Sequence, residues 1–176
     1  MIKYLSVLLI FILVGCGYTT SGFVSVYEED SIIIEPAVND IDITSETRKF
    51  AGYTTFPILI ENKLTNEIIN KFNIDGHFKV VSQGPNALRL SCVVTDYTKE
   101  TLRYEEEDDD VEEQRLRLYT QVKLLSSSGE ILKHEQVVGE TTYFLTGAQS
   151  KSETSAQIDL VDDTARRISE AVIEAW

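Results

Sequence analysis

Residues 87–125, ALRLSCVVTDYTKETLRYEEEDDDVEEQRLRLYTQVKLL, carry the pattern that decides the fold. In residues 87–104 most apolar side chains fall at even positions, and in residues 115–125 they do so again. Alternation of apolar and polar side chains with a period of two is typical of a strand with one buried face. The two runs therefore predict a long antiparallel hairpin with the acidic residues 105–113 at its tip.

Further strands and two helices complete the predicted fold. Apolar runs bounded by glycine, proline or polar clusters predict strands at 31–36, 77–83 and 131–145. Residues 55–73 repeat an apolar side chain every fourth position, which indicates an amphipathic helix. Residues 152–176 form the last predicted helix. Its apolar stripe comprises Ile158, Val161, Ala165, Ile168, Val172 and Ala175.

The order of these elements predicts the fold class. A strand, a helix and a strand precede a three-strand meander and a closing helix. Helices segregated in this way pack together against a mainly antiparallel sheet. We therefore expect an α+β two-layer sandwich, with two helices on one face of a mostly antiparallel sheet of four to five strands. Residues 31–176 form a single domain in this interpretation.

The first sixteen residues indicate export. Lys3 supplies a basic start, and residues 4–14 are apolar apart from Ser6. This stretch is shorter than the roughly 20 residues that span a bilayer, but it suits a secretory signal. The sequence of residues 13–16, Leu-Val-Gly-Cys, resembles a bacterial lipobox, although valine stands where alanine or serine is commoner. The alternative is a plain signal peptide without lipidation.

The lipobox resemblance divides the chain at Cys16. It implies that residues 1–15 are a signal peptide, that Cys16 carries the lipid, and that residues 16–30 form a lipidated leader. Two lipid signals already hold a protein stably on a membrane, so a triacylated cysteine would anchor it firmly. Gly17 is not the aspartate that retains many lipoproteins in the inner membrane. The resemblance thus implies the outer membrane, with the domain on the periplasmic side.

Charge and cysteine content exclude several functions. The chain carries 16 basic and 29 acidic residues, and loss of Lys3 with the signal leaves 15 − 29 = −14. Such an acidic chain is unsuited to nucleic acids, whose binding requires phosphate neutralisation. A lipidated Cys16 leaves Cys92 without a disulfide partner. Cys92 alternates with apolar neighbours and is interpreted as a small buried side chain, in preference to a catalytic thiol.

No catalytic or metal-binding pattern is present. The acidic run 105–113 holds eight acids in nine residues. It lacks the glycine spacing of a calcium loop, so a solvated hairpin tip is favoured over a cation site. His77 and His134 stand apart from any ligand-type motif, and Ser126–Ser128 lie in a turn without a nucleophile elbow. We expect no cofactor, no metal and no enzymatic activity.

Several stretches together resemble the LptE family. They are the lipobox followed by Cys-Gly-Tyr, the helix PILIENKLTNEIINKF at 57–72, DGHFKVV at 75–81 and the strand ending VVTDY at 93–97. The element order and the closing helix also agree, so the resemblance covers essentially the whole mature chain. The acidic tip is not a recognised feature of that family.

The resemblance implies a non-catalytic role in lipopolysaccharide transport. LptE lipoproteins plug and help to assemble the LptD β-barrel and contact lipopolysaccharide as it is inserted into the outer leaflet. The partners implied are therefore an LptD-like barrel, lipopolysaccharide and the outer membrane. The residues also leave open a second class of function, in which the lipoprotein binds and activates another protein without lipopolysaccharide contact.

Six basic residues in the predicted hairpin strands share odd positions, opposite the aliphatic side. Tyr97 and Tyr119 share that phase. Arginine suits phosphate because its planar fork can bond bidentately. The alternative is an ordinary solvated sheet face, since any half-exposed strand collects polar side chains. The candidate contacts for lipopolysaccharide or the barrel are Arg89, Lys99, Arg103, Arg115, Arg117 and Lys123.

Overall fold

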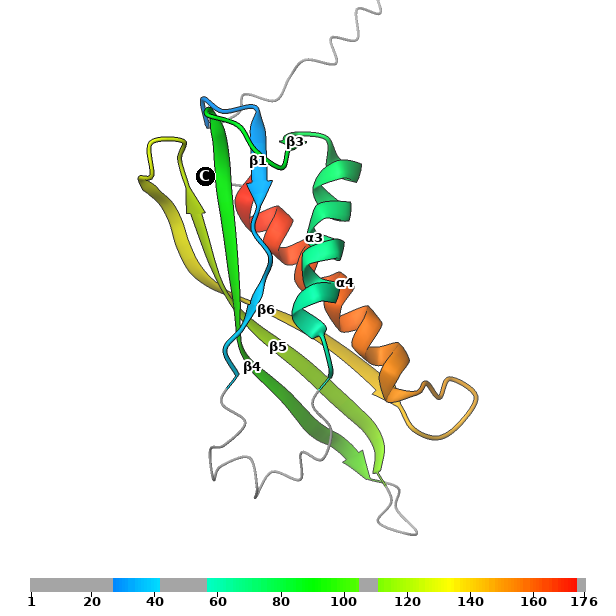
Figure 1. The fold of residues 1–176 in the computed structure, drawn as a ribbon. Helices are drawn as coiled ribbons and strands as arrows, with labels where there is room; N and C mark the ends of the chain where they lie inside the picture. Colours follow the sequence, from blue (N-terminus) through cyan, green and yellow to red (C-terminus); the bar gives the residue numbers. More distant parts are fainter. Residues whose placement is uncertain (1–26, 42–56, 105–110, 174–176) are drawn as a thin grey trace, which may run out of the picture.

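The computed structural model describes residues 27–41, 57–104 and 111–173. They form a sheet with two helices on one face, as predicted (Figure 1). Cys16, the signal segment and the leader up to residue 26 lie outside the described residues, as does most of the acidic run. None of the helices described is both long and apolar enough to cross a membrane.

The predicted meander forms the larger part of the sheet. Strand β4 (Ala87–Tyr104) pairs antiparallel with β5 (Val111–Leu125), which pairs antiparallel with β6 (Ile131–Phe144). The even-numbered apolar residues of β5 are buried, as the alternation predicted. The sheet order is β3-β1-β4-β5-β6, so β6 forms one edge.

Three short strands line the other side of β4. Strands β1 (Ser31–Ile34) and β2 (Val38–Asn39) both pair parallel with β4, and β3 (Lys79–Val80) pairs parallel with β1. Among the described residues the sheet thus has six strands, where four to five were expected. The additional strand, β2, contains only two residues, which are too few for an alternation of apolar and polar side chains to be seen in the sequence.

Helix α3 (Ile60–Asp75) buries the predicted apolar stripe, Ile60, Leu64, Ile68 and Phe72. It begins at Ile60, later than expected, because Leu59 adopts a left-handed conformation with φ 59°. The helix ends where Gly76, with φ 76°, donates its N–H to the Phe72 carbonyl at 3.0 Å. Glycine suits this left-handed position because it has no Cβ.

Helix α4 (Glu153–Ile173) packs directly on β6. A Cβ added to Gly139 would stand 2.8 Å from the Cα of Thr164, so glycine permits the close approach of helix and strand. The buried stripe includes Ala156, Leu160 and Ala165. Ile158 was wrongly assigned to this stripe, because it is 60% exposed.

Cys92 lies in the core between sheet and helices, as predicted. It is 1% exposed, and burial raises the pKa of its thiol to about 12. The thiolate, which is the reactive form of cysteine, is therefore negligible at neutral pH. Cys92 serves as a small apolar side chain.

Candidate functional site

The face of the sheet to which the odd-numbered residues of β4 point changes along the strand. The six candidate residues therefore do not all lie on one face. Val94 pairs with Thr120, but the next pair is Asp96 with Tyr119, so one residue of β4 is unpaired. Such a bulge exchanges the faces to which odd and even residues point. Tyr97 accordingly lies in the core with 4% exposure, and its predicted place on the outward face is wrong.

Lys99 also lies on the helix side, so its predicted place on the outward face is wrong too. It pairs across the ladder with the buried Leu116, and its Nζ donates to Glu153 at 2.7 Å. Burial acts to lower the pKa of Lys99, but the bond to Glu153 and the nearby Tyr143 raise it overall. Lys99 therefore joins the sheet to the first turn of α4 and is not available to a partner on the other face.

Arg115 and Arg117 do share the outward face, where two glutamates surround them. The Arg117 Nε donates to Glu140 at 2.7 Å, and its Nη1 lies 3.3 Å from Glu100. Arg115 stands 3.5 Å from Glu140 and 3.8 Å from Glu100. We call these four residues the ionic quartet. Its two positive and two negative charges balance, so the centre of the outward face is not a basic patch.

Arg103 lies at the far end of the hairpin. A second irregularity in β4, between Thr101 and Arg103, pairs Arg103 with Glu113 on the outward face. Its guanidinium is 3.8 Å from both Glu112 and Glu113. Arg103 is thus separated from the other arginines and faces acidic residues.

Arg89 and Lys123 lie together at the opposite end of the outward face. In the ladders Lys123 is opposite Ser91 and His134, and Arg89 is opposite Leu125. Residues two apart on one strand share a face, so Arg89 is the diagonal neighbour of Lys123. Within the described parts of the chain, neither cation has an ion pair. We call Arg89, Lys123 and His134 the basic row.

The sequence alone did not place His134 with the basic residues of the hairpin. His134 has an even number in β6, whereas the basic residues of β5 have odd numbers. Only the pairing of the two strands shows that His134 lies beside Lys123. Lys123 pairs with His134 because the tight turn around Ser126–Gly129 sets an odd-to-even register. A histidine here contributes positive charge only when it is protonated.

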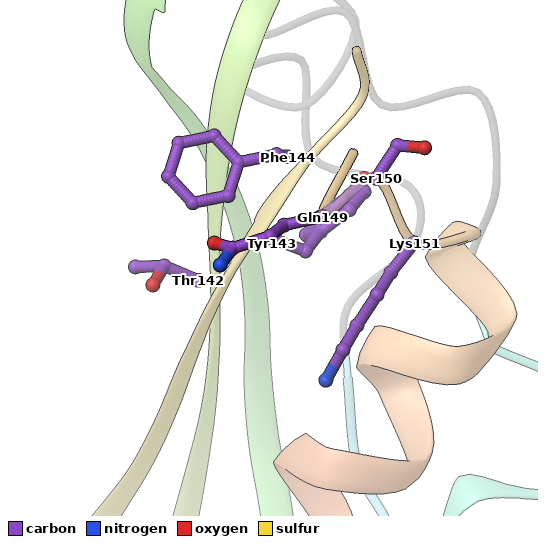
Figure 2. Close-up of a pocket in the computed structure, with 6 residues that line it drawn as sticks. All are labelled: Thr142, Tyr143, Phe144, Gln149, Ser150 and Lys151. Carbon is purple, nitrogen blue, oxygen red and sulfur yellow. The ribbon is translucent and has the colours of Figure 1, made fainter. Parts of the chain in front are cut away.

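A shallow pocket lies where β6 ends (Figure 2). Its volume is about 460 Å³. Lys151, on its wall, pairs with Asp159 at 2.9 Å, and no nucleophile and base stand within hydrogen-bonding distance of each other among the lining residues. The lining residues are Thr142, Tyr143, Phe144, Gln149, Ser150 and Lys151.

The described residues contain no group of three or more histidine, cysteine, aspartate or glutamate side chains placed to hold a metal ion. The features that remain are an open sheet face, a cationic row at one end and a neutral ionic quartet at its centre. The fold that carries them is an α+β sandwich.

Comparison with known families identifies the group within that class. Residues 44–175 match the model of the LptE family, described as lipopolysaccharide-assembly. The chain belongs to the LptE family. It is therefore a non-enzymatic lipopolysaccharide-assembly lipoprotein of the outer membrane, which confirms the resemblance inferred from the sequence.

One solved structure shares the fold at low sequence identity, and two lipoprotein structures are more distantly similar. A hypothetical protein from Chlamydia trachomatis is 9% identical with a TM-score of 0.53, over 82% of this chain and 95% of that one. Rare lipoprotein B from Shewanella oneidensis is 11% identical with a TM-score of 0.45, over 77% and 91%. An uncharacterized lipoprotein B from Nitrosomonas europaea is 18% identical with a TM-score of 0.42, over 85% and 92%. No curated protein matches the chain.

Proposed function

We propose that this lipoprotein plugs an LptD-like β-barrel, assists its assembly and contacts lipopolysaccharide during insertion into the outer leaflet. Cys16 carries the lipid anchor and holds the domain on the periplasmic side of the outer membrane. Membership of a lipopolysaccharide-assembly family supports this proposal.

The observation that carries the lipopolysaccharide contact is the basic row. Arg89 is exposed and Lys123 half-buried, and neither is neutralised by an ion pair among the described residues. Uncompensated cations on adjoining strands attract phosphorylated sugars, and arginine can bond a phosphate with two parallel hydrogen bonds. Arg115 and Arg117 are less suited, because an anion would have to displace Glu100 and Glu140. The contact is therefore assigned first to Arg89 and Lys123.

A second candidate function is favoured by the ionic quartet. A charge-balanced network on an open sheet face suits a protein surface with its own paired charges better than a polyanion. The corresponding function is that of a scaffold or activator that binds another envelope protein without touching lipopolysaccharide.

Charge reversal in the basic row separates the two functions. In Arg89→Glu/Lys123→Glu, binding of purified lipopolysaccharide is expected to weaken by at least about tenfold at moderate salt, since two attractive contacts become repulsive. The matched control is Lys63→Glu/Lys79→Glu, which reverses two exposed cations on α3 and β3. Thermal melting checks that both variants fold.

The barrel partner gives the second measurement. If Arg89→Glu/Lys123→Glu binds lipopolysaccharide as the wild type does and still co-purifies with a β-barrel, the basic row is needed for neither contact, and its assignment to lipopolysaccharide is wrong. If the wild type shows no saturable binding of lipopolysaccharide at all, the scaffold function replaces the proposal.

A further inference from the structure

The pocket at the end of β6 forms where the chain folds back along the strand (Figure 2). Backbone hydrogen bonds fix both ends of the returning segment, residues 145–151. The Leu145 N–H donates to the Glu112 carbonyl of β5 at 2.9 Å. The Lys151 N–H donates to the Phe144 carbonyl of β6, also at 2.9 Å. Between these bonds Gly147, with φ 84°, turns the chain. The pocket therefore has a defined wall before any ligand binds.

The floor and the cation of the pocket are already engaged. Tyr143 is 2% exposed, and its hydroxyl donates to the Gln114 Oε1 at 2.6 Å. The Lys151 ammonium pairs with Asp159 of α4 at 2.9 Å. An anionic ligand would have to displace that carboxylate, so the lining favours a ligand without charge.

The neighbouring strand β5 supplies one cation and one anion at the border of the pocket. Arg115 and Glu113 lie opposite two of the lining residues in the ladder. Arg115 stands 3.5 Å from Glu140, and Glu113 stands 3.8 Å from Arg103. The border of the pocket is therefore charge-balanced, as the lining is.

Three uncharged polar side chains line the pocket and are open to a ligand. Thr142, Gln149 and Ser150 are exposed, and none of their side chains forms a hydrogen bond within the described parts of the chain. Figure 2 shows the amide end of Gln149 directed toward the side on which Thr142 and Phe144 lie. Hydroxyl and amide groups both donate and accept hydrogen bonds, as the hydroxyl groups of a sugar do.

Phe144 supplies the aromatic part of the lining, and its side chain is half-buried. The face of an aromatic ring carries partial negative charge and attracts the C–H bonds of a ligand. A sugar ring has C–H bonds on its faces and hydroxyl groups at its rim. One aromatic ring beside three uncharged polar groups therefore matches a sugar ring better than a phosphate or an acyl chain.

We infer that the pocket binds a neutral sugar ring, which packs on Phe144 and bonds to the three uncharged polar side chains. The volume of about 460 Å³ lies within the range of about 300–1,000 Å³ found for small-molecule sites. This inference goes beyond the proposed function, because the basic row lies at the other end of β5 and attracts phosphate. Sugar binding in the pocket depends neither on phosphate nor on the basic row.

Saturation-transfer nuclear magnetic resonance on the full-length mature protein, in a detergent without a sugar headgroup, tests the inference. The probes are the methyl glycosides of glucose, galactose, mannose and N-acetylglucosamine. Glycerol, which has hydroxyl groups but no ring, and glucose 6-phosphate are the comparison ligands. We expect saturable binding of at least one glycoside with a dissociation constant on the order of 1–10 mM, as suits an open site. Glycerol should give no saturable signal, and glucose 6-phosphate should bind no more tightly than methyl glucoside.

Variants locate the contact. Gln149→Ala and Phe144→Leu should each weaken binding of the glycoside at least about fivefold, because a hydrogen bond or the aromatic face is lost. The matched controls are Gln136→Ala, an exposed glutamine of the same strand, and Tyr104→Leu, an exposed aromatic residue of β4. Both controls should bind as the wild type does. Gln149→Ala removes an exposed side chain without described bonds, so it remains informative if Phe144→Leu melts early.

Competition identifies the source of the sugar. The competitors are the oligosaccharide released from lipopolysaccharide by mild acid and the disaccharide of N-acetylglucosamine. Displacement of the glycoside by either competitor supports the inference and assigns the sugar to lipopolysaccharide or to an N-acetylated glycan of the envelope. Three results would overturn the inference: no saturable binding of any glycoside, tighter binding of glucose 6-phosphate, or unchanged binding in both Gln149→Ala and Phe144→Leu.

Discussion

Asp163 connects helix α4 to the open edge of the sheet. Its carboxylate accepts the backbone N–H of Glu140 at 2.9 Å and also bonds Arg166 and Arg167. Burial acts to raise the pKa of Asp163, but these donors outweigh it and lower the pKa below its ordinary value of 3.8. An edge strand exposes unpaired backbone groups, and Asp163 satisfies one of them.

The depressed pKa predicts a pH-dependent contribution to stability. Because the folded-state pKa lies below the unfolded value, the stabilisation is complete above about pH 4 and is lost as the pH falls through the folded-state pKa. Asp163→Asn should lower the free energy of unfolding by about 1–2 kcal/mol at pH 7, and by less near pH 3. Urea unfolding at both pH values measures the difference.

Asp159→Asn is the matched control for Asp163. Asp159 lies on the same helix, but its side chain is 43% exposed and it bonds only Lys151 among the described residues. Exposed ion pairs contribute little, so this variant should stay within about 0.5 kcal/mol of the wild type. Equal losses in the free energy of unfolding would contradict the claim that Asp163 stabilises the edge strand more than an exposed ion pair does.

At the scale of elements, Gly139 sets the distance between α4 and β6. An added Cβ would lie 1.9 Å from Thr164 Oγ1 and 2.8 Å from its Cα, a backbone atom that a rotamer change cannot move away. Gly139→Ala should therefore lower the free energy of unfolding by about 1–3 kcal/mol. Chemical denaturation followed by circular dichroism measures the loss.

Gly84 provides the comparison for Gly139. A Cβ there would meet the Ala87 Cβ at 3.7 Å, an ordinary contact. Gly84→Ala should change stability by no more than about 0.5 kcal/mol. If Gly139→Ala were as stable as Gly84→Ala, the claim that α4 packs too closely on β6 to admit a Cβ at position 139 would be wrong.

The ionic quartet on the outward face of the sheet provides a second test at the scale of elements, because its contribution to stability can be measured by charge reversal. Arg115→Glu/Arg117→Glu would place four carboxylates together, whereas Arg89→Glu/Lys123→Glu reverses two cations without ion pairs among the described residues. The first variant should melt a few degrees below the wild type and recover partly with added salt, because salt screens repulsion.

The basic-row variant should melt like the wild type, since neither of its residues stabilises the fold through an ion pair in the described parts. Melting curves at low and high salt distinguish the two cases. Equal melting temperatures for both variants at low salt would show that the quartet contributes nothing to the fold.

For the whole molecule, the alternation in β4 and β5 and the four-residue repeat of α3 were sufficient to predict the sandwich. Long periodic elements reveal their buried face because a fixed period repeats many times. The two-residue strands β2 and β3 contain too few residues to show a period, so one was missed and the other was predicted too long.

The candidate site was less predictable, because it depends on register. Because one residue between Val94 and Asp96 is unpaired, Tyr97 and Lys99 point to the helix side of the sheet. The local sequence contains no pattern that predicts such a bulge. The neutralisation of Arg115 and Arg117 depends on partners on two other strands. His134 joined the basic row for the same reason. Long-range pairing is not encoded in the period of one strand.

The central claim is that the chain works within a lipopolysaccharide-inserting barrel. The most direct measurement is affinity purification of the tagged, full-length lipoprotein from detergent-solubilised outer membranes, with the stoichiometry of each co-purified protein determined. The account predicts one large β-barrel protein in a fixed ratio near one to one, retained at high salt. Recovery of the lipoprotein alone, or with a different protein and no barrel, would contradict it.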